Sequence, residues 1–133
     1  GIEQLKKIDK ILDDKVILAK KYNDFFKSHD FINAPKVPSH VTRPSWYMYS
    51  INIKENIRDS LIKYLEENNI ETRLSFPPIH IQPFYIKSYG YSENDYINAI
   101  NSYKSFLDIP IWSGMDDKIQ EYVVKTIINF VNN

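Results

Sequence analysis

Apolar residues recur at intervals of three and four along residues 1–26, with charged residues between them. This spacing places the apolar side chains on one face and predicts a single long amphipathic helix. Its apolar positions are Ile2, Leu5, Ile8, Leu12, Val16, Ala19, Tyr22 and Phe26. No capping side chain precedes the stripe, so we expect this helix to be entered from preceding chain.

The middle of the chain changes to strand periodicity after a loop over 29–44. Residues 45–53 alternate in polarity and are rich in aromatic and β-branched side chains, which predicts a strand. Asn56 and Asp59 then match a capping box, with Asp in place of Glu, at the start of a helix. Asn68 and Asn69 end this helix because asparagine tolerates the left-handed conformation. A short strand over 70–75 is predicted next.

The last third of the chain contains two more helices and one extended segment. Ser92 predicts the cap of a helix over 93–106, and Asp116 or Asp117 begins the last helix with an acid at its positive end. Pro110 predicts an edge position for the extended segment 108–112. The predicted inward positions of these two helices include Tyr96, Ile97, Ile119 and Tyr122.

The order of the elements is helix, strand, helix, strand, loop, helix, strand, helix. It is compatible with a parallel sheet or with a small antiparallel sheet backed by helices. Because the strands are short and bounded by prolines, we favour an α+β fold with a small antiparallel sheet and helices mainly on one face. At 133 residues, without repeats or long linkers, the chain forms one domain.

A proline-rich segment separates the predicted strand 70–75 from the following helix. Pro77 and Pro78 cannot continue a central strand, so we predict an extended loop, stiffened by Pro83, that presents His80 and Gln82. A stiff loop at the end of a strand is a favourable place for a ligand site. The alternative is a rigid connection whose aromatic side chains cover the edge of the core.

Composition and charge exclude several classes of protein. Lys plus Arg equals Asp plus Glu at 17 each, which argues against nucleic acid or an anionic membrane as partner. There is no cysteine, so disulfides and thiolate metal sites are excluded, and a reducing compartment fits. No apolar run approaches the ~20 residues that span a bilayer, and no signal-peptide pattern opens the chain. We therefore expect a cytoplasmic protein.

Candidate chemistry is sparse. His29, His40 and His80 share no metal-ligand spacing, and neither a glycine-rich phosphate loop nor a nucleophile elbow occurs. We therefore expect no metal site and no self-sufficient catalytic site. Arg73, one of three arginines, could bind a carboxylate or phosphate, or be an ordinary surface residue. The tyrosines around Lys87 could stack bases, but packing at the core edge is the favoured interpretation; they are Tyr85, Tyr89, Tyr91 and Tyr96.

Four segments occur in the order that a known family has them. They are Gly1-Ile-Glu-Gln-Leu5, Ser45-Trp-Tyr-Met-Tyr-Ser-Ile51, Asn69-Ile-Glu-Thr-Arg-Leu-Ser-Phe-Pro-Pro-Ile-His-Ile-Gln-Pro83 and Ile109-Pro-Ile-Trp-Ser-Gly-Met115. Together they resemble the C-terminal part of the DegT/StrS-type nucleotide-sugar aminotransferases, over essentially the entire chain. The perosamine-synthase type is the most similar subtype.

This resemblance implies the small C-terminal domain of a fold-type I enzyme, spanning residues 1–133. In such enzymes a large N-terminal domain binds pyridoxal 5′-phosphate through a lysine, and the full-length protein is a homodimer. The reaction moves an amino group from glutamate to a nucleotide-linked keto-sugar for polysaccharide or O-antigen synthesis, with the cofactor as electron sink. The family's cofactor-binding residues lie upstream of the matching part, so we expect no catalytic or cofactor-binding residue here and no activity of the fragment alone.

The resemblance also implies a substrate-facing wall on this domain. We expect His80 to be its main contact, with further contacts from Phe76, Gln82, Arg73 and Tyr47. An apolar surface should be exposed where the large domain would pack. The alternative is a free-standing, non-catalytic module that binds a sugar nucleotide or a partner protein.

Overall fold

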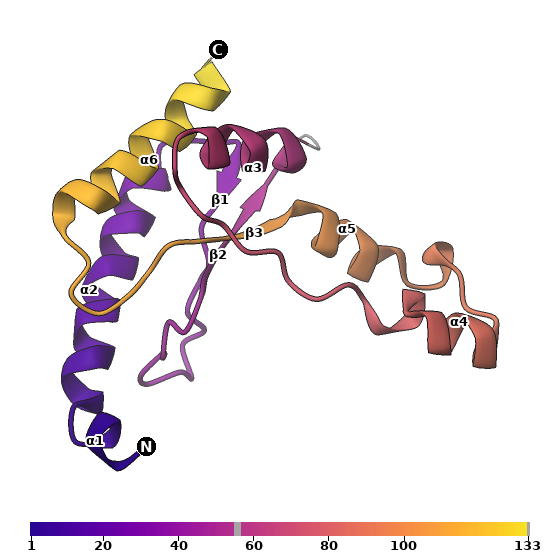
Figure 1. Ribbon diagram of the computed structural model, residues 1–133, viewed down its shortest axis with the longest axis horizontal. Helices are drawn as coiled ribbons and strands as arrows, with labels where there is room; N and C mark the ends of the chain where they lie inside the picture. The colour runs from indigo at the N-terminus through magenta and orange to yellow at the C-terminus, as the bar shows by residue number, and fades with distance from the viewer. Residues whose placement is uncertain (55–56, 133) are drawn as a thin grey trace.

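The structure is a computed structural model that describes residues 1–54 and 57–132 (Figure 1). Its elements are α1 (Ile2–Leu5), α2 (Ile8–Phe26), β1 (Ile32–Asn33), β2 (Tyr49–Ile53), α3 (Arg58–Glu67), α4 (Pro83–Tyr89), α5 (Ile97–Ser105), β3 (Phe106–Ile109) and α6 (Asp117–Asn132). Two short 3-10 helices, Ile79–Ile81 and Glu93–Tyr96, precede α4 and α5.

The three strands form an antiparallel sheet in the order β1-β2-β3. In β2 every second side chain is buried, and these side chains share one face because successive residues of a strand point to opposite sides. Tyr49 pairs with Ile109 and Ile51 with Leu107. These side chains form one hydrophobic cluster with buried residues of α2, α3 and α6. The predicted α+β fold with helices mainly on one face of an antiparallel sheet is therefore confirmed.

Two buried tyrosines lie at the centre of this core. The rings of Tyr22, from α2, and Tyr49, from β2, are 4.8 Å apart between centroids, and both side chains are 0% exposed. The Tyr22 hydroxyl donates to the Pro110 carbonyl at 2.8 Å, and the Tyr49 hydroxyl donates to Asn23 Oδ1. Burial raises the pKa of both hydroxyls well above the ordinary value of 10.0.

We expect the free energy of unfolding to be constant at neutral pH and to fall above about pH 10. In the unfolded chain both tyrosines ionise near their ordinary pKa, whereas in the native core they stay neutral, so alkaline pH favours unfolding. Each group contributes a slope of up to about 1.4 kcal/mol per pH unit. Urea unfolding at a series of pH values measures this slope. Tyr22→Phe should make it shallower, and an identical slope in that variant would contradict the assignment.

The predicted first helix is interrupted. Lys6 and Lys7 separate α1 from α2, and only the last three positions of the predicted stripe are buried, Ala19, Tyr22 and Phe26. Ile2 and Leu5 are 74% and 67% exposed, because α1 and the first half of α2 extend past the sheet and α6 (Figure 1). The interpretation of this stripe as one inward face is thus wrong for its N-terminal half.

The strands differ from the predicted ones in position. β1 lies inside the predicted loop 29–44, and a two-residue strand has no periodicity that could indicate it. β2 begins at Tyr49, because Trp46 has a positive φ of 45° that interrupts the extended backbone. The predicted strand 70–75 is reduced to one bridge between Arg73 and Asp108. β3 is the third and last strand of the sheet. Among the described residues its outer edge pairs only through the bridge between Arg73 and Asp108. This agrees with the edge position that Pro110 predicted.

The prediction of an extended loop after Pro77 and Pro78 is wrong. Residues 79–81 form a 3-10 helix, and Pro83 begins α4. Proline favours the first position of a helix because its missing N–H is not needed there and its φ is already helical. Gly90, with a φ of 71°, ends the helix in the left-handed conformation that glycine adopts without a Cβ clash.

Several helix ends are as predicted. Asn69 has a φ of 58° after α3, Ser92 forms a capping box with Asp95, and α6 begins at Asp117. The predicted cap Asn56 lies outside the described residues. The predicted helix 93–106 is divided into the 3-10 helix Glu93–Tyr96 and α5.

Four positions predicted to face inward do not. Tyr96, Ile97, Ile119 and Tyr122 are each between 44% and 51% exposed, although helical spacing puts them on apolar stripes. Periodicity identifies an apolar face but not whether another element covers it, and each of these stripes is wider than the surface that packs on it.

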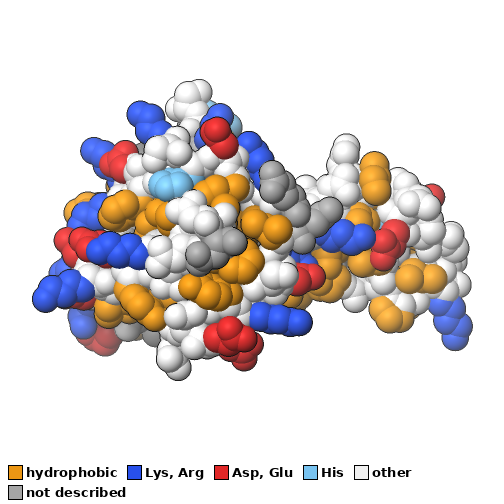
Figure 2. All heavy atoms as spheres, turned by 90° about the horizontal axis from the view of Figure 1, so that it is seen from above, with side chains coloured by type: hydrophobic (Ala, Val, Ile, Leu, Met, Phe, Trp, Pro, Cys, Tyr) orange, Lys and Arg blue, Asp and Glu red, His pale blue; other side chains and the backbone are white. Residues whose placement is uncertain are grey.

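Residues 74–105 form an arm that projects from the sheet, at the right of Figure 1. Of its side chains only His80 and Ile100 are buried. Ile100 is not part of the main core cluster, and Figure 2 shows hydrophobic side chains at the surface of the arm. The arm is thus attached to the core rather than packed into it. None of the described helices combines the length and hydropathy that crossing a bilayer requires.

Candidate functional site

The arm contains a cavity of about 680 Å³ that we call the aromatic cavity. Residues from the 3-10 helix 79–81, from α4 and from α5 contribute to its wall. The lining residues are Ser75, Phe76, Pro78, Ile79, His80, Tyr85, Tyr89, Tyr91, Tyr96, Ala99, Ser102, Tyr103 and Phe106.

A continuous series of ring contacts forms one side of this cavity. Tyr85 and Tyr89 lie one turn apart on α4 with ring centroids 6.0 Å apart, and Tyr89 stacks on Tyr91 at 5.7 Å. Tyr91 meets Tyr96 edge-on at 5.7 Å, and Tyr96 meets His80 at 4.9 Å. Each contact lies in the range that aromatic pairs prefer, so the rings support one another as a wall.

His80 is 7% exposed and adds its ring to this wall beside Tyr96. Its Nε2 is covered by protein atoms and has no hydrogen-bond partner among the described residues. An unpaired buried nitrogen costs about 1–3 kcal/mol, so this side chain is held there against a penalty. In this conformation His80 offers a ligand its ring rather than its Nε2.

The aromatic cavity has no charged side chain in its lining. A side-chain hydrogen bond with Tyr96 is the main cause that raises the pKa of Tyr91 above its ordinary value. The Tyr91 hydroxyl is therefore neutral at physiological pH and is already hydrogen-bonded to Tyr96. Stacked rings with neutral hydroxyls suit an uncharged ring of a ligand, because rings and sugar faces pack on aromatic surfaces.

A second cavity, of about 540 Å³, lies along the outer edge of β3, and we call it the strand-edge cavity. Arg73 and Tyr47 line it, together with Trp112 and with Tyr122 from α6. The backbone of Arg73 exchanges two hydrogen bonds with Asp108, of 3.1 and 2.9 Å. Among the described residues its guanidinium has no carboxylate within ion-pair distance, so it can still accept an anionic partner.

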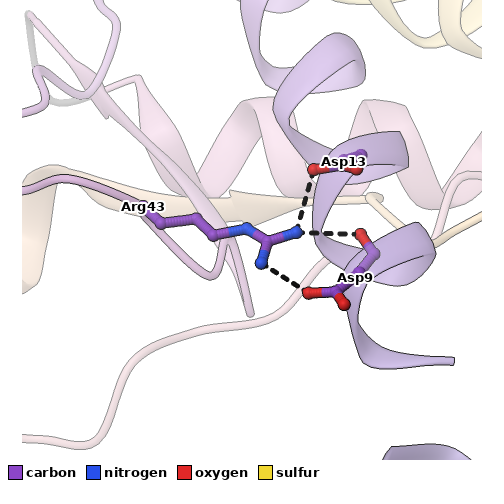
Figure 3. Close-up of polar contacts among 3 residues, drawn as sticks. All are labelled: Asp9, Asp13 and Arg43. Atoms are coloured by element: carbon purple, nitrogen blue, oxygen red, sulfur yellow. Dashed lines mark hydrogen bonds and ion pairs between the residues drawn. The ribbon is translucent and has the colours of Figure 1, made fainter. Parts of the chain in front are cut away.

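Tyr47 follows a loop that an ion-pair cluster fastens to α2 (Figure 3). Arg43 contacts Asp9 Oδ1 at 2.6 Å and Asp13 Oδ1 at 3.0 Å, and it also donates to the Asp9 carbonyl. The two carboxylates raise the pKa of Arg43 through hydrogen bonds. Tyr47 lies further along this loop, and the Nζ of Lys15, on α2, is 6.0 Å from the centre of its ring. This loop places Tyr47 beside the strand-edge cavity rather than beside the arm.

The five residues predicted for a substrate wall thus do not meet at one site. His80 and Phe76 line the aromatic cavity, with Phe76 85% exposed, whereas Arg73 and Tyr47 line the strand-edge cavity. Gln82 is absent from both linings and donates to the Pro77 carbonyl at 3.2 Å.

Sequence reasoning placed the tyrosines of the arm against the core edge, which is not where the structure has them. The four-residue spacing of Tyr85 and Tyr89 could have indicated a shared helix face, had Pro83 been recognised as a helix start. Tyr103 follows Tyr96 by seven residues, a helical spacing that predicts one shared face, whereas Phe106, at the start of β3, gives no comparable signal. In residues 1–54 and 57–132, no three His, Asp or Glu side chains are grouped as metal ligands.

Comparison with known proteins identifies one family. The model of the DegT/DnrJ/EryC1/StrS aminotransferase family matches residues 1–128. The spore coat polysaccharide biosynthesis protein SpsC of Bacillus subtilis is 32% identical over 98% of this chain, which covers 35% of that protein. GDP-perosamine synthase of Vibrio cholerae is 30% identical over 99% of this chain, which covers 36% of that protein.

Solved structures have the same fold. The aminotransferase TlmJ of Streptoalloteichus hindustanus superposes with a TM-score of 0.87 at 20% identity, over 99% of this chain and 35% of that chain. This chain therefore spans about a third of the length of the relatives that it matches.

Proposed function

The chain belongs to the DegT/DnrJ/EryC1/StrS aminotransferase family, and we propose that it is the C-terminal small domain of a pyridoxal-phosphate-dependent nucleotide-sugar aminotransferase. The observation that supports this most is the match of the family model over residues 1–128 in a chain that spans about a third of its relatives. The full-length protein would act in the cytoplasm, as a homodimer.

In this proposal the full-length enzyme moves an amino group from glutamate to the keto-sugar. The cofactor supplies the electron sink, and it is bound by the large domain that lies outside the part of the family matched here. The similarity to GDP-perosamine synthase of Vibrio cholerae supports a nucleotide-linked deoxy-sugar of the perosamine type as substrate.

The two cavities would then contribute to substrate binding in different ways. The aromatic cavity, with His80 and Phe76, has the uncharged stacked surface that suits a ring of the substrate. Arg73 in the strand-edge cavity has the charge that suits a carboxylate or phosphate. Tyr47 flanks Arg73, and Gln82 supports the wall indirectly by its hydrogen bond to the Pro77 carbonyl.

The exposed apolar side chains of α1 and of the first half of α2 would pack on the large domain. Ile2 is 74% exposed, Leu5 67% and Ile8 39%, all at the end of the helix that extends past the sheet. Burying each such side chain would contribute about 1.5–3 kcal/mol, which is enough to fasten one domain to another.

The proposal predicts how this chain behaves alone with the cofactor. Residues 1–133, incubated with pyridoxal 5′-phosphate and then reduced with borohydride, should retain no covalently attached cofactor, and an unreduced sample should transfer no amino group from glutamate. The longer enzyme of this proposal should retain the cofactor after reduction and, in an unreduced sample, transfer the amino group, because it would contain the cofactor-binding lysine. Absorbance spectra and intact mass measure attachment, and cofactor fixed on one lysine of the 133-residue chain would overturn this assignment.

A second candidate function is a free-standing module that binds a sugar nucleotide or a partner protein. The observation that favours it is that all lining residues of the aromatic cavity come from one continuous segment, residues 75–106. Calorimetric titration of residues 1–133 with a GDP-linked 6-deoxyhexose distinguishes the two. Tight binding by the chain alone supports the module, whereas binding only by the longer protein supports the enzyme domain.

A further inference from the structure

The arm is joined to the body of the molecule by few contacts. On its outgoing side, the backbone bridge between Arg73 and Asp108 is the last pairing with the sheet. On its returning side, α5 runs directly into β3, and Asn52 Nδ2 donates to Ser105 Oγ at 2.7 Å. Because the arm buries little apolar surface of its own, these contacts decide its direction.

A buried arginine of the body, Arg58 in the first turn of α3, contacts the arm at this junction. The residue is only 7% exposed, although arginine is almost never buried without a partner. Its Nη1 donates to the Tyr103 carbonyl in the last turn of α5. Its guanidinium also lies 5.5 Å from the centre of the Tyr103 ring. One side chain of the body thus holds both the backbone and the ring of an arm residue.

The guanidinium is itself fixed in one orientation. Asp59 Oδ1 accepts from Nε at 2.8 Å and lies 2.7 Å from Nη2, which leaves Nη1 directed at α5. The last carbonyls of a helix lack partners within the helix, and a cation there also complements the helix dipole. A lysine ammonium has neither the planar fork nor the stacking surface to make these contacts together.

We propose that Arg58 is a positioning residue that sets the direction of the arm, and with it the shape of the aromatic cavity. Tyr103 is the link, because its backbone and ring are held by Arg58 and its side chain lines that cavity. The consequence for substrate affinity rests on the proposed function, whereas the direction of the arm does not.

Because the chain contains no cysteine, two introduced cysteines can be spin-labelled selectively. The distance between the two labels then reports the direction of the arm. Lys63, on α3, and Lys87, on α4, are exposed and suit replacement by labelled cysteines. The parent chain should give one narrow distribution of interspin distances. Arg58→Met and Arg58→Lys should each broaden it by about twofold or more, because few other contacts restrain the arm.

Arg43→Met is the matched control, since it removes another bonded arginine, on the loop that is fastened to α2 (Figure 3). Its distribution should equal that of the parent. If both Arg58 variants keep the parent distribution, the proposal is wrong. If Arg58→Met fails to fold, Arg58→Lys decides, and loss of folding in both would make Arg58 a requirement of the fold, which also overturns the proposal. No cofactor or substrate enters this measurement, so its outcome is independent of the proposed function.

Discussion

Replacing Tyr22 with alanine is expected to lower the free energy of unfolding by about 3–5 kcal/mol, as for other large aromatic side chains removed from a core. Tyr22 is 0% exposed, and its ring contacts those of Phe26 and Tyr49. The variant would leave a cavity where α2 packs on the sheet, and the Pro110 carbonyl would lose its hydrogen bond. Since the free energy of unfolding of such domains is only about 5–15 kcal/mol, this substitution would remove a large share of it.

Two comparison variants separate the contributions. Tyr22→Phe keeps the ring and removes only the hydroxyl, so we expect a smaller loss of about 1–3 kcal/mol from the unpaired carbonyl. Tyr89→Ala removes a ring that is 63% exposed, and it should change the stability by no more than about 0.5 kcal/mol. Urea unfolding of the three variants gives the values. Equal losses for Tyr22→Ala and Tyr89→Ala would contradict the central position of Tyr22.

In the longer enzyme that the proposed function implies, replacing His80 with alanine is expected to lower the affinity for the nucleotide-sugar about tenfold, which corresponds to ~1.4 kcal/mol. The His80 ring contacts Tyr96 and lines the aromatic cavity, so its loss removes part of the wall and the support of a neighbouring ring. The fold should survive, because His80 lies on the arm, outside the main core cluster. The substitution also breaks no hydrogen bond of Nε2, because this buried atom has no partner among the described residues.

His40→Ala is the matched control for this measurement. His40 is an exposed histidine on the loop before β2 and lines neither cavity. Steady-state kinetics should show KM for the nucleotide-sugar raised in the His80 variant and unchanged in the His40 variant, with KM for glutamate equal in both. An unchanged KM in the His80 variant would show that the aromatic cavity is not part of the substrate site.

The candidate site shows how far residue types alone can lead. His80 and Phe76 line one cavity, because they lie in one short segment whose prolines limit its conformations. Arg73 and Tyr47 line a different cavity, since a single bridge to Asp108 and a loop bonded to α2 decide where they lie. The sequence analysis did not predict that the tyrosines stack on one another, because it assigned Pro83 to a loop and not to the start of a helix.

Features that depend only on neighbouring residues could be predicted from the sequence. The start of α6 at Asp117, the left-handed Asn69 and the capping box of Ser92 follow from local hydrogen bonding and backbone preference, and all are present in the structure. The class of the fold follows from the order of helices and short strands bounded by prolines, and the predicted alternation in β2 matches its burial of every second residue.

Which apolar faces are covered, and which segments pair, depends on contacts that form only in the folded chain. β1 exists because β2 lies beside it, and the predicted strand 70–75 is reduced to one bridge because β3 meets it at a single residue pair. Ile2 and Leu5 have the same periodicity as Tyr22, yet they remain exposed because nothing in the described chain reaches them. Periodicity identifies which face of a helix is apolar. Whether that face is buried depends on contacts between residues that are distant in the sequence.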